Sequence, residues 1–253
     1  MTRRRLWAGG GLAAVAITVW AVDRINSLSI ETQATNPIIR WEWVFLREDT
    51  RGELWDATVQ HLQLTLIAVG VGLLIAAGLS AIALRFRWTF APITAFTSFL
   101  YTIPSIALFG LLVTRYGNVL SAEIALVSYT LLVLVRNIVA GIDSVPTSVT
   151  DAADGLGLGR TRRLLTVELP LALPVIVAGI RVATVTTVGL VGITAIIQLG
   201  GLGQLIFDGY GTQYYTKIVV GSVLSVLLAL ALDVAFNRLE VVLTPWARRR
   251  SPA

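Results

Sequence analysis

Cysteine is absent from this chain of 253 residues. Its absence excludes disulfide bonds, thiolate metal sites and cysteine nucleophiles. Histidine occurs once, as His61, so a metal site built from several histidines is excluded as well. The phosphate-binding pattern Gly-x-x-x-x-Gly-Lys-Ser/Thr is also missing, so we expect any ATP hydrolysis to come from another chain. We predict no catalytic residue, no metal and no bound cofactor here.

Charged residues are scarce too, at 14% of the chain against 55% hydrophobic residues. Soluble domains carry about 25% charged residues, so this composition indicates a protein whose solvent is lipid. The net charge is +5, and Lys217 is the only lysine. The arginines flank apolar segments and do not form one basic stripe, which argues against nucleic acid as a partner.

Six apolar segments have the length of a membrane crossing, since about 20 helical residues span the hydrocarbon core. They are residues 6–22, 61–84, 90–113, 120–142, 169–199 and 218–236. The fifth is too long for one simple helix, so we expect a span followed by a re-entrant or broken piece. Pro104 should kink or break the third. The first could be a signal peptide, but no small-x-small cleavage site precedes Asp23, which favours a retained helix.

The arginine clusters predict the orientation, because cytoplasmic loops are enriched in basic residues. Six spans with a cytoplasmic N-terminus put all four clusters on the cytoplasmic side: residues 3–5, 85–87, 160–163 and 248–250. The acid-rich segment 23–56 then faces outward, and its tryptophans suit the membrane–water interface. We therefore expect both termini to be cytoplasmic.

One long polar stretch interrupts the second half of the chain, at residues 143–168. Ser148 with Asp151 three residues later resembles a capping box, which predicts a short helix starting there. Thr161 could cap a second helix. Three glycines should end the first helix: Gly155, Gly157 and Gly159. On this pattern alone, a solvated loop joining two spans is favoured over a helix–turn–helix at the membrane surface. An amphipathic membrane-surface helix is a third option, but its apolar face is short.

Seven residues in and after this stretch resemble the EAA motif of ABC importer permeases. That motif reads Glu-Ala-Ala, three residues, Gly, nine residues, Ile, one residue, Leu-Pro. The matching residues are Asp151, Ala152, Ala153, Gly157, Val167, Leu169 and Pro170, with conservative departures at Asp151 and Val167. The resemblance implies an all-α integral membrane protein with the type I ABC importer (MetI-like) fold and about six transmembrane helices. It implies that the loop couples the chain to an ATPase subunit.

The resemblance also implies partners in the bacterial plasma membrane. These are two ATPase subunits that bind ATP and magnesium, a second permease subunit, identical or paralogous, and an extracytoplasmic substrate-binding protein. It divides the chain into three parts: an added helix with an outer segment at 1–56, a permease domain at 57–245 and a basic tail at 246–253.

A narrower resemblance covers most of residues 58–245. The segments 102–110, 167–181 and 200–203 are similar to the osmoprotectant branch of these permeases. That branch imports quaternary amines such as glycine betaine, choline, carnitine and proline betaine. Import of such a solute is therefore implied, and another small solute such as an amino acid is the alternative.

Six residues are predicted to line the pathway or its gate: Tyr101, Pro104, Arg181, Gly200, Gly201 and Gly203. Arg181 lies near mid-depth in its span, where it could line the pathway, latch the gate, or be satisfied by carbonyls or an acid on a neighbouring helix. The glycines could form a mobile gate or an ordinary loop.

Several other polar residues receive simpler interpretations. Arg136 and Asp233 are expected to snorkel to the cytoplasmic boundary, and Glu123 to meet water at the outer end of its span. Four tyrosine rings could bind a quaternary ammonium group or belong to an interfacial belt: Tyr101, Tyr210, Tyr214 and Tyr215.

Two other classes of protein compete with a permease. An ion-coupled secondary transporter usually needs intramembrane acids and often internal repeats, and the spans offer little of either. An intramembrane hydrolase needs a nucleophile and a base, and His61, expected at a helix boundary, is the single histidine available.

Overall fold

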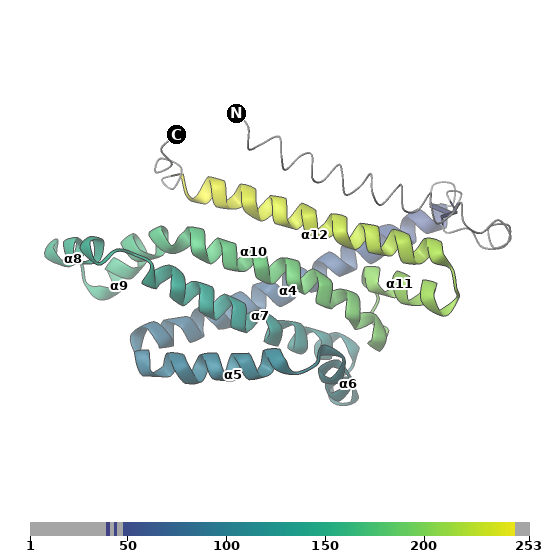
Figure 1. Ribbon diagram of the computed structural model, residues 1–253, viewed down its shortest axis with the longest axis horizontal. Coiled ribbons are helices and arrows are strands. Elements are labelled where there is room, and N and C mark those ends of the chain that lie inside the picture. The colour runs from purple at the N-terminus through teal and green to yellow at the C-terminus, as the bar shows by residue number, and fades with distance from the viewer. Residues whose placement is uncertain (1–38, 41–42, 45–47, 246–253) are drawn as a thin grey trace, which may run out of the picture.

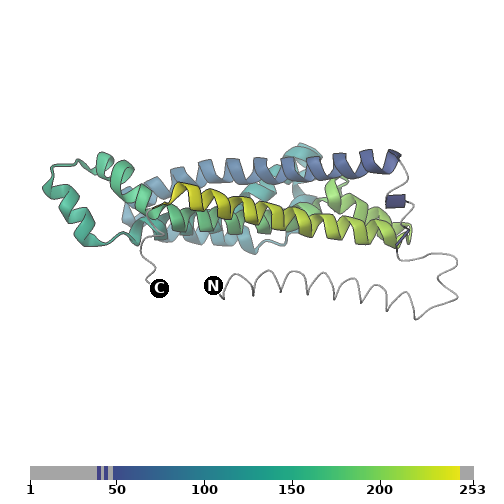
Figure 2. The same cartoon turned by 90° about the horizontal axis from the view of Figure 1, so that it is seen from above.

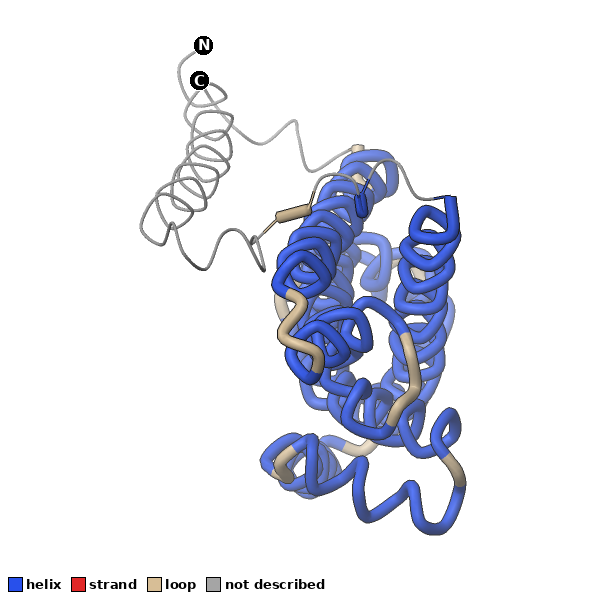
Figure 3. Tube along the Cα trace, turned by 90° about the vertical axis from the view of Figure 1, so that its right-hand side faces the viewer, coloured by secondary structure: helices blue, strands red, loops and turns tan. Residues whose placement is uncertain are grey.

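A computed structural model describes residues 39–40, 43–44 and 48–245 of the chain. The predicted first span at 6–22, its preceding arginines and the basic tail at 246–253 lie outside these residues. The regular structure of the described part is entirely helical (Figure 3). This agrees with the predicted all-α class.

The helices follow one another along the chain in a simple order. They are α4 (Glu48–Arg85), η1 (Arg87–Thr89), α5 (Phe90–Thr102), α6 (Ser105–Tyr116), α7 (Asn118–Asp143), α8 (Thr147–Gly155), α9 (Arg160–Arg163), η2 (Leu164–Glu168), α10 (Leu169–Ile193), η3 (Thr194–Ile197), α11 (Gly201–Gly211) and α12 (Tyr215–Leu243).

Four helical stretches of the described part are long and apolar enough to cross a membrane, or five if the bent pair α5–α6 counts as one span. They coincide with the five predicted spans that fall within the described residues. The second span is longer than predicted, because α4 begins at Glu48 and not near residue 61. Apolar segments of this length form helices in lipid because a helix satisfies its own backbone hydrogen bonds.

Helix α7 is the centre of the bundle. It packs against α4, α5, α6 and α10, and 56% of its most apolar stretch of 18 residues is buried. Helix α12 lies at the periphery beside α10 and α11 (Figure 1). Only 6% of its most apolar stretch of 18 residues is buried. Such an exposed apolar helix is suited to a lipid or protein environment, and not to water.

The predicted break at Pro104 is confirmed. Helices α5 and α6 meet at an angle of 90°, and Ile103 between them is extended. Proline cannot donate a backbone hydrogen bond, so the break frees backbone groups inside an apolar bundle. Tyr129 on α7 donates its hydroxyl to the carbonyl oxygen of Ile103 at 2.5 Å, which satisfies one of them.

The predicted break after the fifth span is confirmed as well. Helix α10 ends at Ile193, and the chain turns through η3 into α11, which packs back against α12 and α4. Gln198, Gly200 and Gly201 have φ of 54°, 99° and 71°. This left-handed backbone reverses the chain within a few residues.

Glycines let the helices approach closely, as is usual in membrane bundles. A Cβ atom on Gly72 would lie 2.0 Å from the Thr130 hydroxyl oxygen, and one on Gly179 would lie 2.3 Å from the Asn137 Cβ. The closest backbone approach is at Gly203 of α11, where a Cβ atom would lie 2.1 Å from the carbonyl oxygen of Gly192. Helix α11 is thus packed directly on the end of α10.

We predict that Gly203→Ala destabilises the protein, because the added methyl group meets backbone that cannot rotate away. Overpacking of this kind costs about 1–3 kcal/mol. Gly189→Ala on α10 is the matched control, since nothing lies within 4 Å of its Cβ position. The denaturation midpoints of the two detergent-solubilised variants provide the measurement. Equal midpoints would contradict the close packing of α11 on α10.

Candidate functional site

The loop between α7 and α10 extends beyond one end of the bundle. Figure 2 shows α8 and the segment after it projecting past the ends of the long helices. Asp151 and Ala152 are exposed on α8, and Ala153 is buried. Leu156 at the tip is 82% exposed. A small helix with an exposed alanine and leucine offers a surface for another protein.

Two predictions about this loop are wrong in detail. Helix α8 begins at Thr147 after Pro146, and no side chain caps it, so Ser148 and Asp151 do not form a capping box. Proline fixes the backbone angle at the entry to the helix, which places Ser148 already inside the first turn. Thr161 is likewise no cap, because it lies within α9, which begins at Arg160.

The second predicted helix is not separate. Residues 160–197 form one continuous stretch in which α9, η2, α10 and η3 follow one another. The segment η2 has π-helical hydrogen bonds, and Leu169 donates to the carbonyl of Leu164. Pro170 follows directly and lacks a donor of its own, and π segments are commonly found where the regular ladder is interrupted. Three of the seven motif residues, Val167, Leu169 and Pro170, lie here in the stem.

Gly157 ends α8 in a Schellman motif. Its N–H donates to the carbonyl of Asp154 at 2.9 Å, and the N–H of Leu158 donates to that of Ala153 at 3.1 Å. Gly157 has φ of 77°, which glycine adopts without strain. No atom lies within 4 Å of its Cβ position, so backbone conformation and not crowding requires glycine here.

Arg163 connects the tip of the loop to its stem. Its Nη1 lies 2.5 Å from Asp154 Oδ2 on α8, and its Nε lies 2.6 Å from Glu168 Oε1 on η2. Glu168 is 8% exposed. Charge-assisted hydrogen bonds of this kind fix relative geometry. Sequence reasoning missed this bridge, although three charges within the polar stretch were a signal for it.

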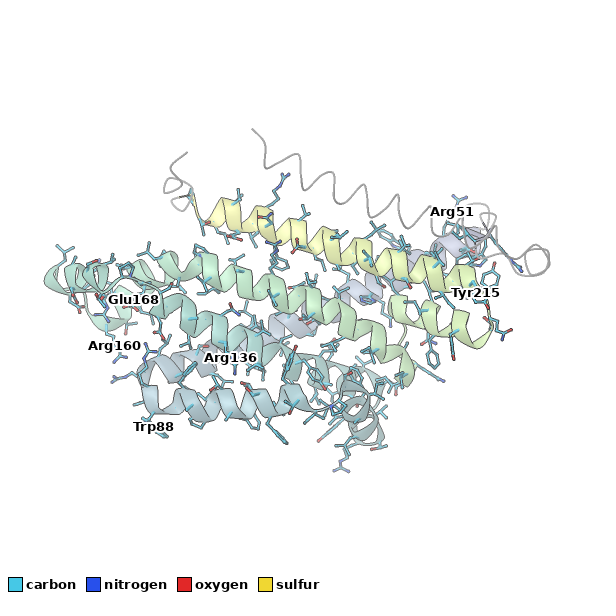
Figure 4. All side chains as sticks on the ribbon, in the orientation of Figure 1. Arg51, Trp88, Arg136, Arg160, Glu168 and Tyr215 are labelled. Carbon is cyan, nitrogen blue, oxygen red and sulfur yellow. The ribbon has the colours of Figure 1, made fainter. Side chains whose placement is uncertain are left out.

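Two further contacts tie the same end to the bundle. Arg160 donates from Nη2 to the carbonyl oxygen of Leu84 at the end of α4, at 2.8 Å. Arg87 forms a bidentate pair with Asp143 at the end of α7, with distances of 2.9 and 2.5 Å. Figure 4 places Arg160, Glu168 and Trp88 together at this end, and Arg51 and Tyr215 at the opposite one.

Of the predicted gate glycines, Gly200 lies in the turn between η3 and α11, and Gly201 and Gly203 lie in the first turn of α11. Helix α4 holds this segment in place. The side-chain amide of Gln60 donates to the carbonyl of Leu199 at 2.7 Å and accepts from the N–H of Gly201 at 2.9 Å. A Cβ atom on Gly200 would lie 2.3 Å from Gln60 Oε1. Position 200 therefore favours glycine for two reasons: its positive φ and the closeness of the Gln60 side chain.

His61 holds the same turn and is fully buried inside α4, so its expected place at a helix boundary is wrong. Its Nε2 lies 2.9 Å from the carbonyl oxygen of Val188, and its Nδ1 accepts from the N–H of Leu202 at 3.3 Å. Both ring nitrogens are thus engaged by backbone, which leaves neither for a hydrolytic base. No local pattern in the sequence indicated that Gln60 and His61 act on this turn.

Arg181 has an acidic partner on a neighbouring helix, as one of its sequence interpretations required. Its Nη2 donates to Asp233 Oδ2 on α12 at 2.8 Å, and its Nε donates to Oδ1. Asp233 therefore pairs within the bundle and does not snorkel as expected.

Glu123 was expected to meet water, but both its carboxylate oxygens are buried, with no hydrogen-bond partner in the described part.

The four tyrosines do not form one cage. Tyr101 on α5 is 44% exposed, and its ring meets that of Tyr129 edge to face at 6.0 Å. Tyr210, Tyr214 and Tyr215 lie on or beside α11 and α12. The Tyr214 ring contacts Trp43 at 5.8 Å and has the guanidinium of Arg40 over it at 5.0 Å. That ring already binds a cation of this protein.

Comparison with known proteins gives consistent matches. The family of binding-protein-dependent transport system inner membrane components matches residues 68–249. The osmoprotectant import permease protein OsmW of Salmonella typhimurium is 40% identical over 203 residues, which are 78% of this chain and 94% of that protein. The choline transport system permease protein OpuBB of Bacillus subtilis is 33% identical, over 79% and 92%. The MetNI methionine ABC transporter, solved in inward-facing conformations, matches with a TM-score of 0.69 at 21% identity, over 78% of this chain and 99% of that one.

We predict that Arg163→Gln loosens the projecting loop, because α8 loses its ionic link to the stem. Limited digestion with subtilisin should cut residues 155–162 several times faster than in the unchanged protein. Arg162→Gln is the matched control, since Arg162 is exposed and forms no ion pair within the described residues. If both variants are cut equally fast, Arg163 does not fix the loop.

Proposed function

This chain belongs to the family of binding-protein-dependent transport system inner membrane components, and from that premise we propose that it is the membrane-spanning permease subunit of an ABC importer for compatible solutes. The type I importer fold and the osmoprotectant resemblance are both confirmed by the matches above. A partner ATPase supplies the energy, and the chain itself contributes the solute pathway and the coupling loop.

The observation that carries this proposal is the loop at residues 147–163. It presents exposed Ala152 and Leu156 beyond the bundle, and Arg163 connects it to a helix that continues to residue 197. A docked ATPase that moves α8 would therefore move α10 and, through it, the turn at Gly200 and Gly201. Rigid helices transmit such a displacement because packed elements shift as units.

The mechanism is a switch between two states. ATP binding closes two ATPase subunits, which draws the coupling loops of two permease subunits together and opens the pathway outward to a solute-loaded binding protein. Hydrolysis resets the pathway inward. Net transport requires that the two states differ in their affinity for solute. In this structure, Gln60 and His61 of α4 hold the turn between η3 and α11 and the first residues of α11.

The solute class follows from the relatives, whose names describe osmoprotectant and choline permeases. A quaternary amine such as glycine betaine, choline, carnitine or proline betaine is therefore proposed for this chain. An amino acid remains the alternative solute, because the methionine transporter shares the fold. The second permease subunit is an identical copy or a paralogue.

We predict that Gly157→Val uncouples ATP hydrolysis from solute uptake while the protein still inserts into the membrane. Valine at a φ of 77° is strained, so the Schellman motif that ends α8 would be lost. Gly159→Val is the control, since Gly159 has an ordinary φ of −62° and no atom within 4 Å of its Cβ position. Uptake per ATP hydrolysed in reconstituted vesicles is the measurement. Full uptake by the Gly157 variant would argue against the docking assignment.

We also predict that residues 148–165 lie on the cytoplasmic side, where an ATPase can reach them. The natural absence of cysteine makes a single Ser148→Cys variant a clean probe. A membrane-impermeant thiol reagent should label it in inside-out vesicles and leave it unlabelled in intact cells. Labelling from outside the cell would show that an ATPase cannot reach this loop, and would contradict the proposed docking.

A further inference from the structure

Arg136 lies within a membrane-spanning helix and is exposed on the surface of the single subunit. It precedes the end of α7 at Asp143 by seven residues, which is about 10 Å at the helical rise. Figure 4 shows it between α7 and α5, inward of the end that carries Arg160 and Glu168. Under the proposed orientation, this depth is inside the hydrocarbon region.

The side chain does not snorkel toward the cytoplasmic boundary, contrary to the sequence expectation. Its Nη2 donates to the hydroxyl of Ser98 on α5 at 3.3 Å. Ser98 is eight residues from the start of α5 at Phe90, or about 12 Å along that helix, so the guanidinium reaches sideways and stays at depth.

No acid compensates this charge within the described residues. Arg181, the other deep arginine, has a bidentate partner in Asp233, whereas Arg136 takes part in none of the ion pairs there. An unpaired arginine facing lipid costs at least about 2.5 kcal/mol at the centre of a span, and a long side chain nearer a helix end avoids this cost by reaching to the interface, which Arg136 does not do. Its surroundings in the membrane are therefore expected to be water or another polar group.

The neighbouring face of α5 is polar as well. One side of α5 carries three polar residues, because spacings of four and three residues place side chains on the same side of a helix. They are Thr94, Ser98 and Tyr101. All three are at least partly exposed. A polar stripe beside an unpaired arginine is what a water-filled pathway needs and what lipid disfavours.

We infer that Arg136, Ser98 and Tyr101 form a solute subsite in the pathway that selects quaternary amines bearing a carboxylate. The guanidinium of Arg136 binds the carboxylate, as its planar donors match that group. The Tyr101 ring, one helical turn or about 5 Å further along α5, receives the quaternary ammonium on its face. The inference rests on the proposed function and deepens it by naming the solute class.

This arrangement resolves a difficulty that a deep arginine raises for a cationic solute. A positive charge in the pathway repels choline, which carries an ammonium group and no carboxylate. It attracts the carboxylate end of a zwitterion such as glycine betaine or carnitine. The subsite therefore favours zwitterions over choline.

The test uses Ser98→Cys in inside-out vesicles that carry the complete importer, since the chain has no natural cysteine. An anionic methanethiosulfonate reagent should label the introduced thiol several times faster than a cationic one, and the added change Arg136→Gln should abolish this preference. Leu230→Cys on the exposed face of α12 serves as the lipid-facing control and should stay unlabelled. Thr94→Cys serves as a second position on the stripe if the first variant does not insert.

Two results would overturn the subsite. If neither reagent labels the stripe, lipid or a carboxylate of a second subunit covers Arg136. If both reagents label it at equal rates, the arginine does not act on anions there. These readouts need no transport, so they are separate from the proposed function, which fails if the unchanged importer takes up no quaternary amine.

In uptake assays, Arg136→Gln should lower glycine betaine transport about tenfold or more relative to choline transport. An equal loss of transport for both solutes would also contradict the selectivity.

Discussion

The need to satisfy every backbone polar group without water shapes this protein more than any other constraint. Both places where a spanning segment of the described part breaks are repaired by side chains from other helices. Tyr129 bonds to Ile103 at the α5–α6 break, and Gln60 with His61 bonds to the turn between η3 and α11. Each repair fixes the direction in which the chain continues, so the breaks are defined joints and not loose loops.

The same constraint applies to charge. Arg181 and Asp233 share one bidentate pair between α10 and α12, so both charges can lie partly buried between two spanning helices. Arg136 has a serine as its partner, which fits a polar pathway better than a lipid face. Glu123 is buried with both oxygens unpartnered in the described part, an arrangement for which we have no physical account.

The proposed coupling depends on continuity between the loop and the membrane-spanning helices. Arg163 links Asp154 at the tip to Glu168 in the stem, and the helix from Arg160 runs on to the turn that Gln60 holds. Force applied at α8 would therefore reach the opposite end of the bundle through one element. The π-helical segment before Pro170 is the one irregular point in the membrane-proximal stem.

The sequence by itself determined the apolar spans, the breaks at Pro104 and after residue 199, and the family, because length, proline and motif spacing are local properties of the chain. Only the tertiary structure decided that α9 continues into α10, that Asp233 is the partner of Arg181, and that His61 holds a turn 141 residues away. These are contacts between helices distant in sequence. Their partners depend on how the helices rotate and pack, which no local pattern of residues specifies.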